Sequence, residues 1–329
     1  MGEKEALWGL LFIFPSPLIR QGGVVIVTPM AEEEFRSGFV PIVGRPNVGK
    51  STLLNRLIGQ KVAIISPKPQ TTWWRILGIK TRPDAQIIFV DTPGIHRARE
   101  NFNIHMVREA RESMKDGDVI VHLIEATDPS APGDDEIRED LRKRETPVLL
   151  AINKIDLLKD RGEVEEIASH CQQRFPYAGV FPISALLGDG LEELEEAIVS
   201  YLPQGPPYYP EDMITDQTER ALAAEIIREK IFHLTRQEVP YSCAVVIEEF
   251  KDNPQKDLVY IRAIINVERE SQKGIVIGKG GRMLKEIGSA ARRELEEMLG
   301  KKVYLELWVR VQEDWRKKDP VLRDFGLIR

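Results

Sequence analysis

The segment at residues 44–51 restricts the fold of this chain more than any other feature of its sequence. It reads Gly-Arg-Pro-Asn-Val-Gly-Lys-Ser, with an apolar run at residues 39–43 before it and a helical pattern at residues 50–58 after it. Glycines at both ends let a loop wrap around a phosphate group, and the N-terminus of the following helix adds partial positive charge. A turn in which Ser51 only caps the helix is the alternative, but the full motif in this context favours a phosphate-binding loop.

Apolar runs alternate with helical patterns up to about residue 203. Such alternation is typical of an α/β domain in which helices cover both faces of a mostly parallel sheet. We therefore predict an α/β P-loop domain at residues 38–203. Its expected strands are residues 39–43, 86–90, 118–124, 148–152 and 180–183, with an edge strand at 75–80, and its expected helices are residues 50–58, 102–115, 134–144, 164–175 and 191–201.

The rest of the chain predicts a second, α+β domain at residues 216–329, behind a stiff proline-rich linker at residues 204–215. Asp216 and Glu219 have capping-box spacing at the start of its first helix. Residues 1–37 lack a regular pattern, and we interpret them as a disordered leader or an upstream mis-start, with Met30 as an alternative first residue. The expected order αββααβ consists of a helix at 216–234, strands at 242–250 and 258–267, helices at 271–277 and 282–299, and a strand at 303–311.

Composition and charge limit the class of protein. The net charge of −6 argues against a general binder of polyanions, although it allows a local basic patch. Cys171 and Cys243 are far apart and outside any metal-binding spacing, so we expect free thiols and a cytoplasmic protein. No apolar run reaches the roughly 18 residues of a membrane-spanning helix, so we expect no transmembrane segment.

The phosphate-binding loop implies a nucleotide and a magnesium ion. Lys50 can reach the β- and γ-phosphates, and the Ser51 hydroxyl can bind Mg²⁺. Asp91 ends a strand beside the loop and can hold the same ion, usually through water, while the Gly94 amide can approach the γ-phosphate. Thr72, which we favour over Thr71, can ligate Mg²⁺ when GTP is bound; the alternative is that both threonines only begin a strand. The residues predicted to bind the nucleotide and its Mg²⁺ here are Gly44, Arg45, Pro46, Asn47, Val48, Gly49, Lys50, Ser51, Thr52, Thr71, Thr72, Asp91, Thr92, Pro93 and Gly94, of which Ser51, Thr72 and Asp91 are the predicted metal ligands.

Residues 153–156, Asn-Lys-Ile-Asp, follow an expected strand and predict recognition of guanine. Asp156 can accept hydrogen bonds from N1 and N2 of guanine. Adenine lacks the N2 donor and would leave a carboxylate oxygen unpaired, so such a site rejects it. We expect Lys154 to pack over the base, Asn153 to brace the loop, and the Ala185 amide that follows Ser184 to donate to guanine O6. The sequence thus predicts GTP·Mg²⁺ as the bound nucleotide.

These motifs resemble the translation-factor-related GTPases, in the subgroup that contains Era, EngA and MnmE. Its successive signatures are GRPNVGKST, the QTT of residues 70–72, DTPG, NKID and SA, and the stretches SGFVPIVGRPNVGKSTLLNRLIGQK and LELWVRVQEDWRKKDPVLRDFG look like the Era family. The resemblance covers the chain from Ser37 onward. It implies hydrolysis of GTP to GDP and phosphate, with Lys50, Asn47 and Gly94 at the reacting phosphate.

Two features bear on hydrolysis and switching. Ile95 stands where Ras-type GTPases carry a water-orienting glutamine, so the attacking water must be placed otherwise. In the resembling subgroup an asparagine at the position of Asn47 can hold K⁺ beside the phosphates; the alternative is that it only braces the loop. Trp73 and Trp74 follow QTT, where the family usually has a basic residue. They are either core residues or an exposed stacking surface, and we favour partial burial.

A glycine turn in the second domain indicates RNA binding. Residues 278–281 read Gly-Lys-Gly-Gly between two expected helices, and in the order αββααβ such a turn is typical of a type II KH domain, where it clamps a nucleic-acid backbone. We expect the floor of the adjacent groove at residues 261–267. The basic residues around the turn are Lys273, Lys279, Arg282, Lys285, Arg292 and Arg293, and the predicted RNA contacts are Ile275, Ile277, Gly278, Lys279, Gly280, Gly281, Arg282 and Lys285.

The resemblance implies a GTPase switch that binds small-subunit (16S) ribosomal RNA near its 3′ end and assists maturation of the 30S subunit. It also implies peripheral association with the cytoplasmic face of the cell membrane, which the residues do not indicate by themselves. The alternative from another class is a constitutive RNA-binding protein whose G domain is only a structural platform. We set aside an EngA-like factor with two G domains, because the chain has a single P-loop.

Overall fold

The computed structural model describes residues 35–66, 68, 71–95, 101–160, 162–236 and 238–327, and at residues 101–103 the backbone alone. Most of the predicted leader and Gln70 of the QTT motif therefore lie outside the described residues. Arg36 and Ser37, which we assigned to the leader, belong to the first strand, because Arg36 pairs with Ala85 in the sheet. The first domain thus begins before the predicted boundary at residue 38.

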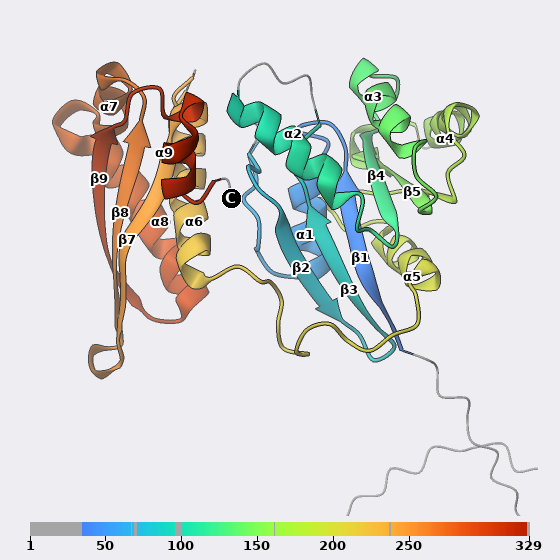
Figure 1. Ribbon diagram of the computed structural model, residues 1–329, viewed down its shortest axis with the longest axis horizontal. Coiled ribbons are helices and arrows are strands. Elements are labelled where there is room, and N and C mark those ends of the chain that lie inside the picture. The colour runs from blue at the N-terminus through green and yellow to red at the C-terminus, as the bar shows by residue number, and fades with distance from the viewer. Residues whose placement is uncertain are drawn as a thin grey trace, which may run out of the picture. The chain divides into compact units, whose positions relative to one another are not determined.

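The first domain is built on a six-stranded sheet with the strand order β2-β3-β1-β4-β5-β6 (Figure 1). Neighbouring strands are parallel except for the antiparallel pair of β2 and β3, which places β2 at one edge of the sheet as predicted. The strands are β1 (Arg36–Val43), β2 (Ile76–Thr81), β3 (Ala85–Asp91), β4 (Ile120–Glu125), β5 (Val148–Asn153) and β6 (Gly179–Pro182). The predicted α/β fold is confirmed.

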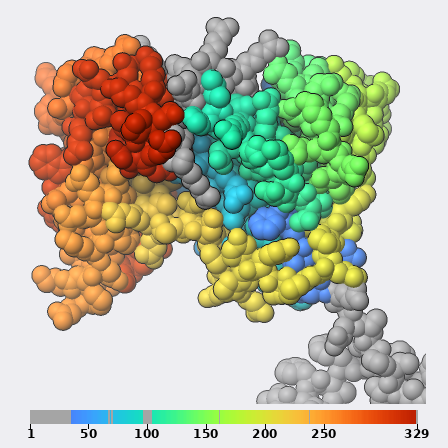
Figure 2. Space-filling model, in the orientation of Figure 1, coloured from blue at the N-terminus to red at the C-terminus, as the bar shows by residue number. Residues whose placement is uncertain are grey.

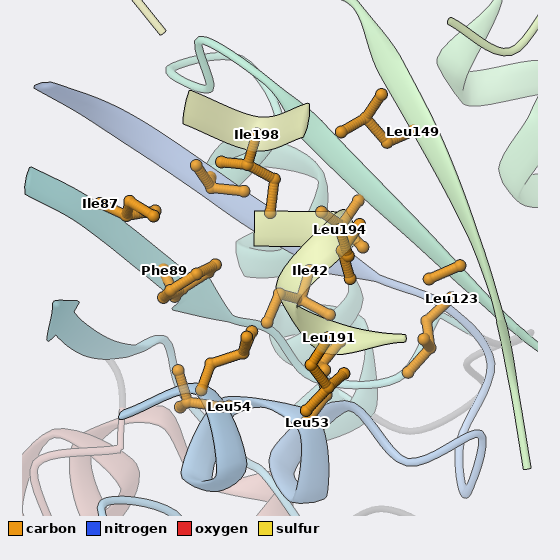
Figure 3. Close-up of a cluster of buried hydrophobic side chains, with 14 of the residues drawn as sticks. Ile42, Leu53, Leu54, Ile87, Phe89, Leu123, Leu149, Leu191, Leu194 and Ile198 are labelled. Atoms are coloured by element: carbon orange, nitrogen blue, oxygen red, sulfur yellow. The ribbon is translucent and has the colours of Figure 1, made fainter. Parts of the chain in front are cut away.

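Helices cover both faces of this sheet, and each face has its own apolar core. Leucines of α1 and α5 pack on one face, around Ile42 and Phe89 (Figure 3). On the other face α2, α3 and α4 contribute Ala110, Ile137 and Cys171 to a second buried cluster. The helices are α1 (Lys50–Ile58), α2 (Asn101–Ser113), α3 (Pro132–Leu141), α4 (Glu163–Arg174) and α5 (Leu191–Tyr201).

Residues 204–215, the predicted linker, are bound to the edge of the first sheet. The buried side chain of Gln86 accepts hydrogen bonds from the main-chain N–H groups of Tyr208 (2.7 Å) and Tyr209 (2.9 Å). Further along, the Ile79 N–H donates to the main-chain oxygen of Ile214 at 2.8 Å. The segment is therefore part of the packing of the first domain rather than a spacer.

The second domain has the predicted order αββααβ. Its sheet has the order β7-β8-β9, with β7 antiparallel and β9 parallel to the central β8, so β9 is an edge strand. α6 and α8 cover one face of it through Ile227, Ile231, Ile287 and Leu295. The elements are α6 (Glu219–Leu234), β7 (Ala244–Asn253), β8 (Leu258–Val267), α7 (Glu270–Ile277), α8 (Arg282–Leu299) and β9 (Lys302–Val311).

A short helix that the sequence analysis did not predict, α9 (Asp319–Asp324), follows β9. Its residues, red in Figure 2, form one surface with the orange strands of the second domain. Cys171 and Cys243 are both buried and free, as predicted. Among the described residues no helix combines the length and the apolar character needed to cross a membrane.

The start of α6 differs from the prediction. Its N-cap is Thr218, whose hydroxyl oxygen accepts a hydrogen bond from the Ala221 N–H at 3.2 Å. The predicted capping box of Asp216 and Glu219 is therefore wrong. A hydroxyl two residues closer to the first helical turn takes the capping position, and Asp216 lies before the helix.

Candidate nucleotide site and RNA groove

The phosphate-binding loop connects β1 to α1 through two residues with positive φ angles. Asn47 has a φ of 65° and Gly49 a φ of 104°. A side chain in this conformation is strained, and a Cβ atom at position 49 would also lie 2.4 Å from Asn153 Nδ2. Both the backbone and the available space therefore require glycine at position 49.

Lys50 extends back over the loop that precedes it. Its Nζ donates to the main-chain oxygens of Gly44 (3.0 Å) and Arg45 (2.9 Å). Burial lowers the pKa of this amine to about 8, against the opposing charges of Asp91 and Asp134. Phosphate oxygens would add negative charge around the amine and favour its protonated form.

The three predicted metal ligands lie together. Ser51 Oγ is 2.7 Å from Asp91 Oδ2 and 3.0 Å from Thr72 Oγ1, and Thr72 Oγ1 is 3.2 Å from the same carboxylate oxygen. Asp91 Oδ1 is buried without a hydrogen-bond partner, and burial raises the pKa of this carboxyl against the charge of Lys50. Two hydroxyls and one carboxylate are the oxygen ligands that Mg²⁺ prefers, so the residues fit this ion.

A hollow of about 490 Å³ opens beside these ligands. It brings together the P-loop, the Thr71–Thr72 pair, Gly94 and Lys154, which sequence reasoning placed in one site. It also includes Ile64, Ile65, Ser66 and Glu125, which belong to no motif and were missed. The full lining is Pro46, Asn47, Gly49, Lys50, Ser51, Thr52, Ile64, Ile65, Ser66, Thr71, Thr72, Gly94, Glu125 and Lys154.

Asn153 joins the phosphate-binding loop to the Ala185 loop that is predicted to hold the base. Its Nδ2 donates to the Val48 main-chain oxygen at 2.7 Å, and its Oδ1 accepts from the Ala185 N–H at 2.9 Å. The predicted bracing role of Asn153 thus has a structural basis. The Ala185 amide, predicted to donate to guanine O6, donates to Asn153 in this structure.

The carboxylate that is predicted to read guanine and the lysine beside it are also held in place. Ser184 Oγ donates to Asp156 Oδ1 at 2.6 Å, which leaves Asp156 Oδ2 for another donor. Lys154 has a φ of 66° and forms an ion pair of 2.8 Å with Glu125. Glu125 is therefore the residue that sets the direction of Lys154.

The segment between α1 and Thr72 contacts α6. The Ile65 N–H donates to Glu229 Oε1 at 3.1 Å, and Arg228 donates to the main-chain oxygen of Thr71 at 2.5 Å. Of the two threonines, it is Thr72 whose hydroxyl lies within hydrogen-bond distance of Ser51 and Asp91. Further contacts join Lys61 to Glu229 and Glu294, and Lys68 to the main-chain oxygens of Phe232 and Thr235.

Trp73 and Trp74 differ in burial. Trp73 is 4% exposed and packs with Met106 of α2 and Trp315 after β9. The Arg228 guanidinium carbon lies 4.2 Å from the Trp73 ring centroid. Trp74 is half-buried. The predicted partial burial is thus confirmed for Trp74 and wrong for Trp73, because the C-terminal segment covers that ring.

The glycine turn of the second domain is exposed and basic. Gly278, Gly280 and Gly281 have φ angles of 71°, 62° and 78°, and α8 begins directly after them at Arg282. The predicted contacts Ile275, Lys279, Arg282 and Lys285 are exposed, as are Arg292 and Arg293 along α8. The backbone turn and the positive charge therefore occur together.

The groove beside this turn has a different floor from the one predicted. A hollow of about 400 Å³ lies between α8 and β9, and Leu305 and Leu307 supply its apolar lining. Ile261, Ala263 and Ile265 of the predicted floor are fully buried. The prediction is wrong because β8 is the central strand under the helices, whereas β9 is the edge strand. The complete lining is Gly281, Leu284, Lys285, Gly288, Ser289, Arg292, Leu305 and Leu307.

Comparison with known proteins identifies both halves of the chain. A family model described as 50S ribosome-binding GTPase matches residues 39–154, and a KH domain model matches residues 238–316. GTPase Era of Geotalea uraniireducens is 54% identical over 297 residues, which cover 90% of this chain and 99% of that relative. GTPase Era of Carboxydothermus hydrogenoformans is 50% identical over 292 residues, which cover 89% of this chain and 98% of that relative.

Two solved structures match over nearly the same length. A point variant of Aquifex aeolicus Era bound to GDP·AlF₄⁻ is 47% identical with a TM-score of 0.87, and the match covers 90% of this chain and all of that one. Era in complex with MgGDPNP and nucleotides 1506–1542 of 16S ribosomal RNA is 48% identical, with the same TM-score and coverage. The chain therefore belongs to the Era family of GTPases.

Proposed function

We propose that this GTPase is a molecular switch that binds 16S ribosomal RNA near its 3′ end and assists maturation of the small ribosomal subunit. The observation that carries the proposal is the Era structure with MgGDPNP and nucleotides 1506–1542 of 16S RNA, together with a nucleotide hollow and a glycine-turn groove in this chain. Crosslinking in cells followed by sequencing of the bound RNA tests it. Enrichment of the 16S 3′ end is expected, and its absence would overturn the proposal.

The proposed location is cytoplasmic, with peripheral association at the cytoplasmic face of the cell membrane. The second part rests on the family resemblance alone. Cell fractionation tests it: the protein should divide between the soluble and membrane fractions, and high salt should release the membrane share. Protein that stays wholly soluble at low salt would contradict the peripheral association.

The proposed roles at the nucleotide follow from the geometry. Ser51 and Thr72, with Asp91 directly or through water, would hold Mg²⁺, which supplies positive charge beside the phosphates. Lys50, whose Nζ donates to the Gly44 and Arg45 oxygens, would bind phosphate oxygens, and the Gly94 amide is proposed to donate to the γ-phosphate. Catalysis of phosphoryl transfer is mainly positioning and charge stabilisation, which these groups can provide.

We expect hydrolysis to be faster in K⁺ than in Na⁺ at equal ionic strength. Ile95 cannot orient water, so a cation held by Asn47 would supply charge where other GTPases insert an arginine. Phosphate release measured in the two salts checks this, with Asn47→Ser expected to remove the difference. Equal rates of the wild type in both salts would contradict the role proposed for Asn47.

We expect Gly288→Leu to weaken RNA binding by about tenfold or more, since displacing one stacked base costs about 1–3 kcal/mol. A Cβ atom at Gly288 would already lie 3.3 Å from Leu307 Cδ1, so a leucine would fill the groove between α8 and β9. Binding of a fluorescent single-stranded RNA measures the effect. Gly288→Ala, which adds one methyl group, should lose less RNA affinity than the leucine variant. Both variants should hydrolyse GTP at the wild-type rate. A leucine variant with unchanged RNA affinity would exclude this groove.

Nucleotide state and RNA binding are proposed to be coupled through the contacts of the Thr72 segment with α6. Thr72 would join the Mg²⁺ site only with GTP, while its neighbour Thr71 is held by Arg228 and Ile65 is held by Glu229. A change at Thr72 therefore acts on a helix of the RNA-binding domain. By linkage, RNA must shift the GTP/GDP preference by the same factor as nucleotide shifts RNA affinity.

We expect Arg228→Lys to reduce this coupling. Arg228 pairs with Glu225 at 2.6 Å, stacks on Trp73 and donates to Thr71, and a lysine cannot keep all three contacts. RNA affinity should differ about 5–150-fold between the GTP and GDP states of the wild type, and by a smaller factor in the variant. The matched control is Arg220→Lys on the same helix, because Arg220 donates to the Ile247 and Glu248 oxygens of β7. Equal coupling in both variants would contradict the role of Arg228.

The other candidate is a constitutive RNA-binding protein whose G domain is only structural. The polar contacts between the Thr72 segment and α6 favour the switch, since a passive platform does not need them. If wild-type RNA affinity is the same with GTP, with GDP and without nucleotide, the protein binds RNA constitutively and is not a nucleotide-dependent switch.

A further inference from the structure

The sheet of the second domain has an aromatic face opposite the helices. The strand register places Tyr260 beside Tyr304 and Ile264 beside Trp308 on adjacent strands. Tyr304 is 59% and Trp308 58% exposed, although both are large rings on regular strands. The Tyr260 and Tyr304 rings are stacked, with centroids 5.7 Å apart and an interplanar angle of 18°.

Two of these rings, those of Tyr260 and Trp308, are oriented by hydrogen bonds. Glu306 lies between them on β9, and its carboxylate accepts hydrogen bonds from the Tyr260 hydroxyl and from Trp308 Nε1 at 2.7 Å. Arg262 Nε donates to the same carboxylate at 3.2 Å. Three donors thus offset the charge of Glu306. Because the bonded rings are already oriented, a base that stacks on them loses little further side-chain entropy.

The aromatic face continues toward the glycine turn. A hollow of about 570 Å³ lies beside Trp308, within the range of roughly 300–1,000 Å³ that is usual for ligand sites. Its lining combines Arg262, Ile264 and Arg310 of the aromatic face with Lys273 of α7, the helix that leads into the glycine turn. β9 also contributes to both the RNA groove and the aromatic face. Leu305 and Leu307 line the groove, and the even-numbered residues of β9 lie on the aromatic face.

The chemistry of the face fits RNA bases. RNA-recognition sheets stack unpaired bases on aromatic rings that project from the face of the sheet. Four cations and three carboxylates share the face, so stacking rather than phosphate attraction should dominate there. The cations are Lys251, Arg262, Lys302 and Arg310, and the carboxylates are Glu248, Glu249 and Glu306.

The RNA in the complex of the Era relative is longer than the stretch that a KH groove holds. A KH groove clamps about four nucleotides, whereas the Era relative holds a fragment from nucleotide 1506 to 1542, which is 37 nucleotides. We propose that the aromatic face is a second RNA-binding surface. On it, unpaired bases of the same RNA stack on Tyr304 and Trp308 after the strand passes the edge of β9. This inference rests on the proposed function.

The test compares two RNAs on the full-length protein: an oligonucleotide of about five nucleotides that fills the groove, and the 37-nucleotide RNA of the 1506–1542 region. The double variant Tyr304→Ala, Trp308→Ala should lose about 10–100-fold in affinity for the long RNA, at about 1–3 kcal/mol per stacked base. Affinity for the short RNA and the basal GTPase rate should be unchanged. Tyr208→Ala is the matched control, since its ring is 57% exposed on the first domain.

A second measurement does not depend on the stability of the double variant. Stacking should quench Trp308 fluorescence when the long RNA binds, and the conservative Trp308→Phe variant should bind the long RNA nearly as well but without that quench. The salt dependence of binding should change little in the double variant, because few phosphate contacts are lost.

Three outcomes would overturn the inference. Unchanged affinity of the double variant for the long RNA excludes this surface. Unchanged RNA affinity with weaker binding to 30S subunits would assign the face to a protein partner. An equal loss for both RNAs would mean damage to the groove instead of loss of a second surface. A wild type that binds neither RNA would instead refute the proposed function itself.

Discussion

Asp156→Asn should change the preferred nucleotide from GTP to XTP. Asp156 is proposed to accept hydrogen bonds from N1 and N2 of guanine, and hydrogen bonds to a charged group contribute about 1.5–3 kcal/mol each. Asparagine removes the charge and turns a donor toward the N2 amino group, so GTP binding should weaken by about 10²–10⁴-fold. Xanthine carries an oxygen in place of the N2 amino group, so the asparagine amide could donate to it while accepting from N1. Competition binding of GTP, XTP and ATP measures the change.

The control for this substitution is Ser184→Ala. Ser184 donates to Asp156 Oδ1 at 2.6 Å and therefore orients the carboxylate without facing the base. Its loss should weaken GTP binding by about tenfold or less, the cost of one hydrogen bond, and should leave XTP disfavoured. A protein that keeps its preference for GTP after Asp156→Asn would show that guanine is read elsewhere.

The sequence predicted those parts of the site that depend on residues close together in the chain. The P-loop, the Asp91 strand end and the Asn153 loop follow β1, β3 and β5, which run parallel in one sheet, and the carboxyl ends of such strands meet at one edge. Ser51, Thr72 and Asp91 accordingly lie within hydrogen-bond distance of one another. The limits of α1, α5, β8 and α8 agree with the prediction to the residue, because their apolar periodicity ends at clear breaks.

The sequence predictions failed where the role of a residue depends on packing between segments that are far apart in the chain. A run of apolar residues does not reveal strand order, so the sequence analysis placed the floor of the RNA groove at residues 261–267. Only the edge position of β9 assigns it to Leu305. Trp73 is buried because Trp315, 242 positions later in the chain, covers it. Glu125 and Ile65 line the nucleotide hollow without any motif, since their role comes from adjacency in space.

Lys50→Met should reduce kcat for GTP hydrolysis by about 10²–10³-fold, the usual cost of removing one donor that stabilises charge at the reacting group. Methionine keeps most of the side-chain volume but cannot donate to a phosphate or to the Gly44 and Arg45 oxygens. Single-turnover phosphate release separates this effect from weaker binding. If the variant hydrolyses GTP at a rate near that of the wild type, Lys50 is not a catalytic residue.

The same substitution should stabilise the nucleotide-free protein, because Lys50 is buried and burial lowers its pKa from 10.5 to about 8. Below pH 8 both the folded and unfolded states carry the proton, and the folded state bears a cost on the order of 3 kcal/mol. Between pH 8 and 10.5 the unfolded chain binds more protons, so wild-type stability should rise relative to the variant by about 1.4 kcal/mol per pH unit. Urea unfolding of both proteins without nucleotide or Mg²⁺, at pH 7 and pH 9.5, measures the difference. The difference in unfolding free energy between the variant and the wild type should narrow as the pH rises. If it does not, the amine of Lys50 is not desolvated before GTP binds.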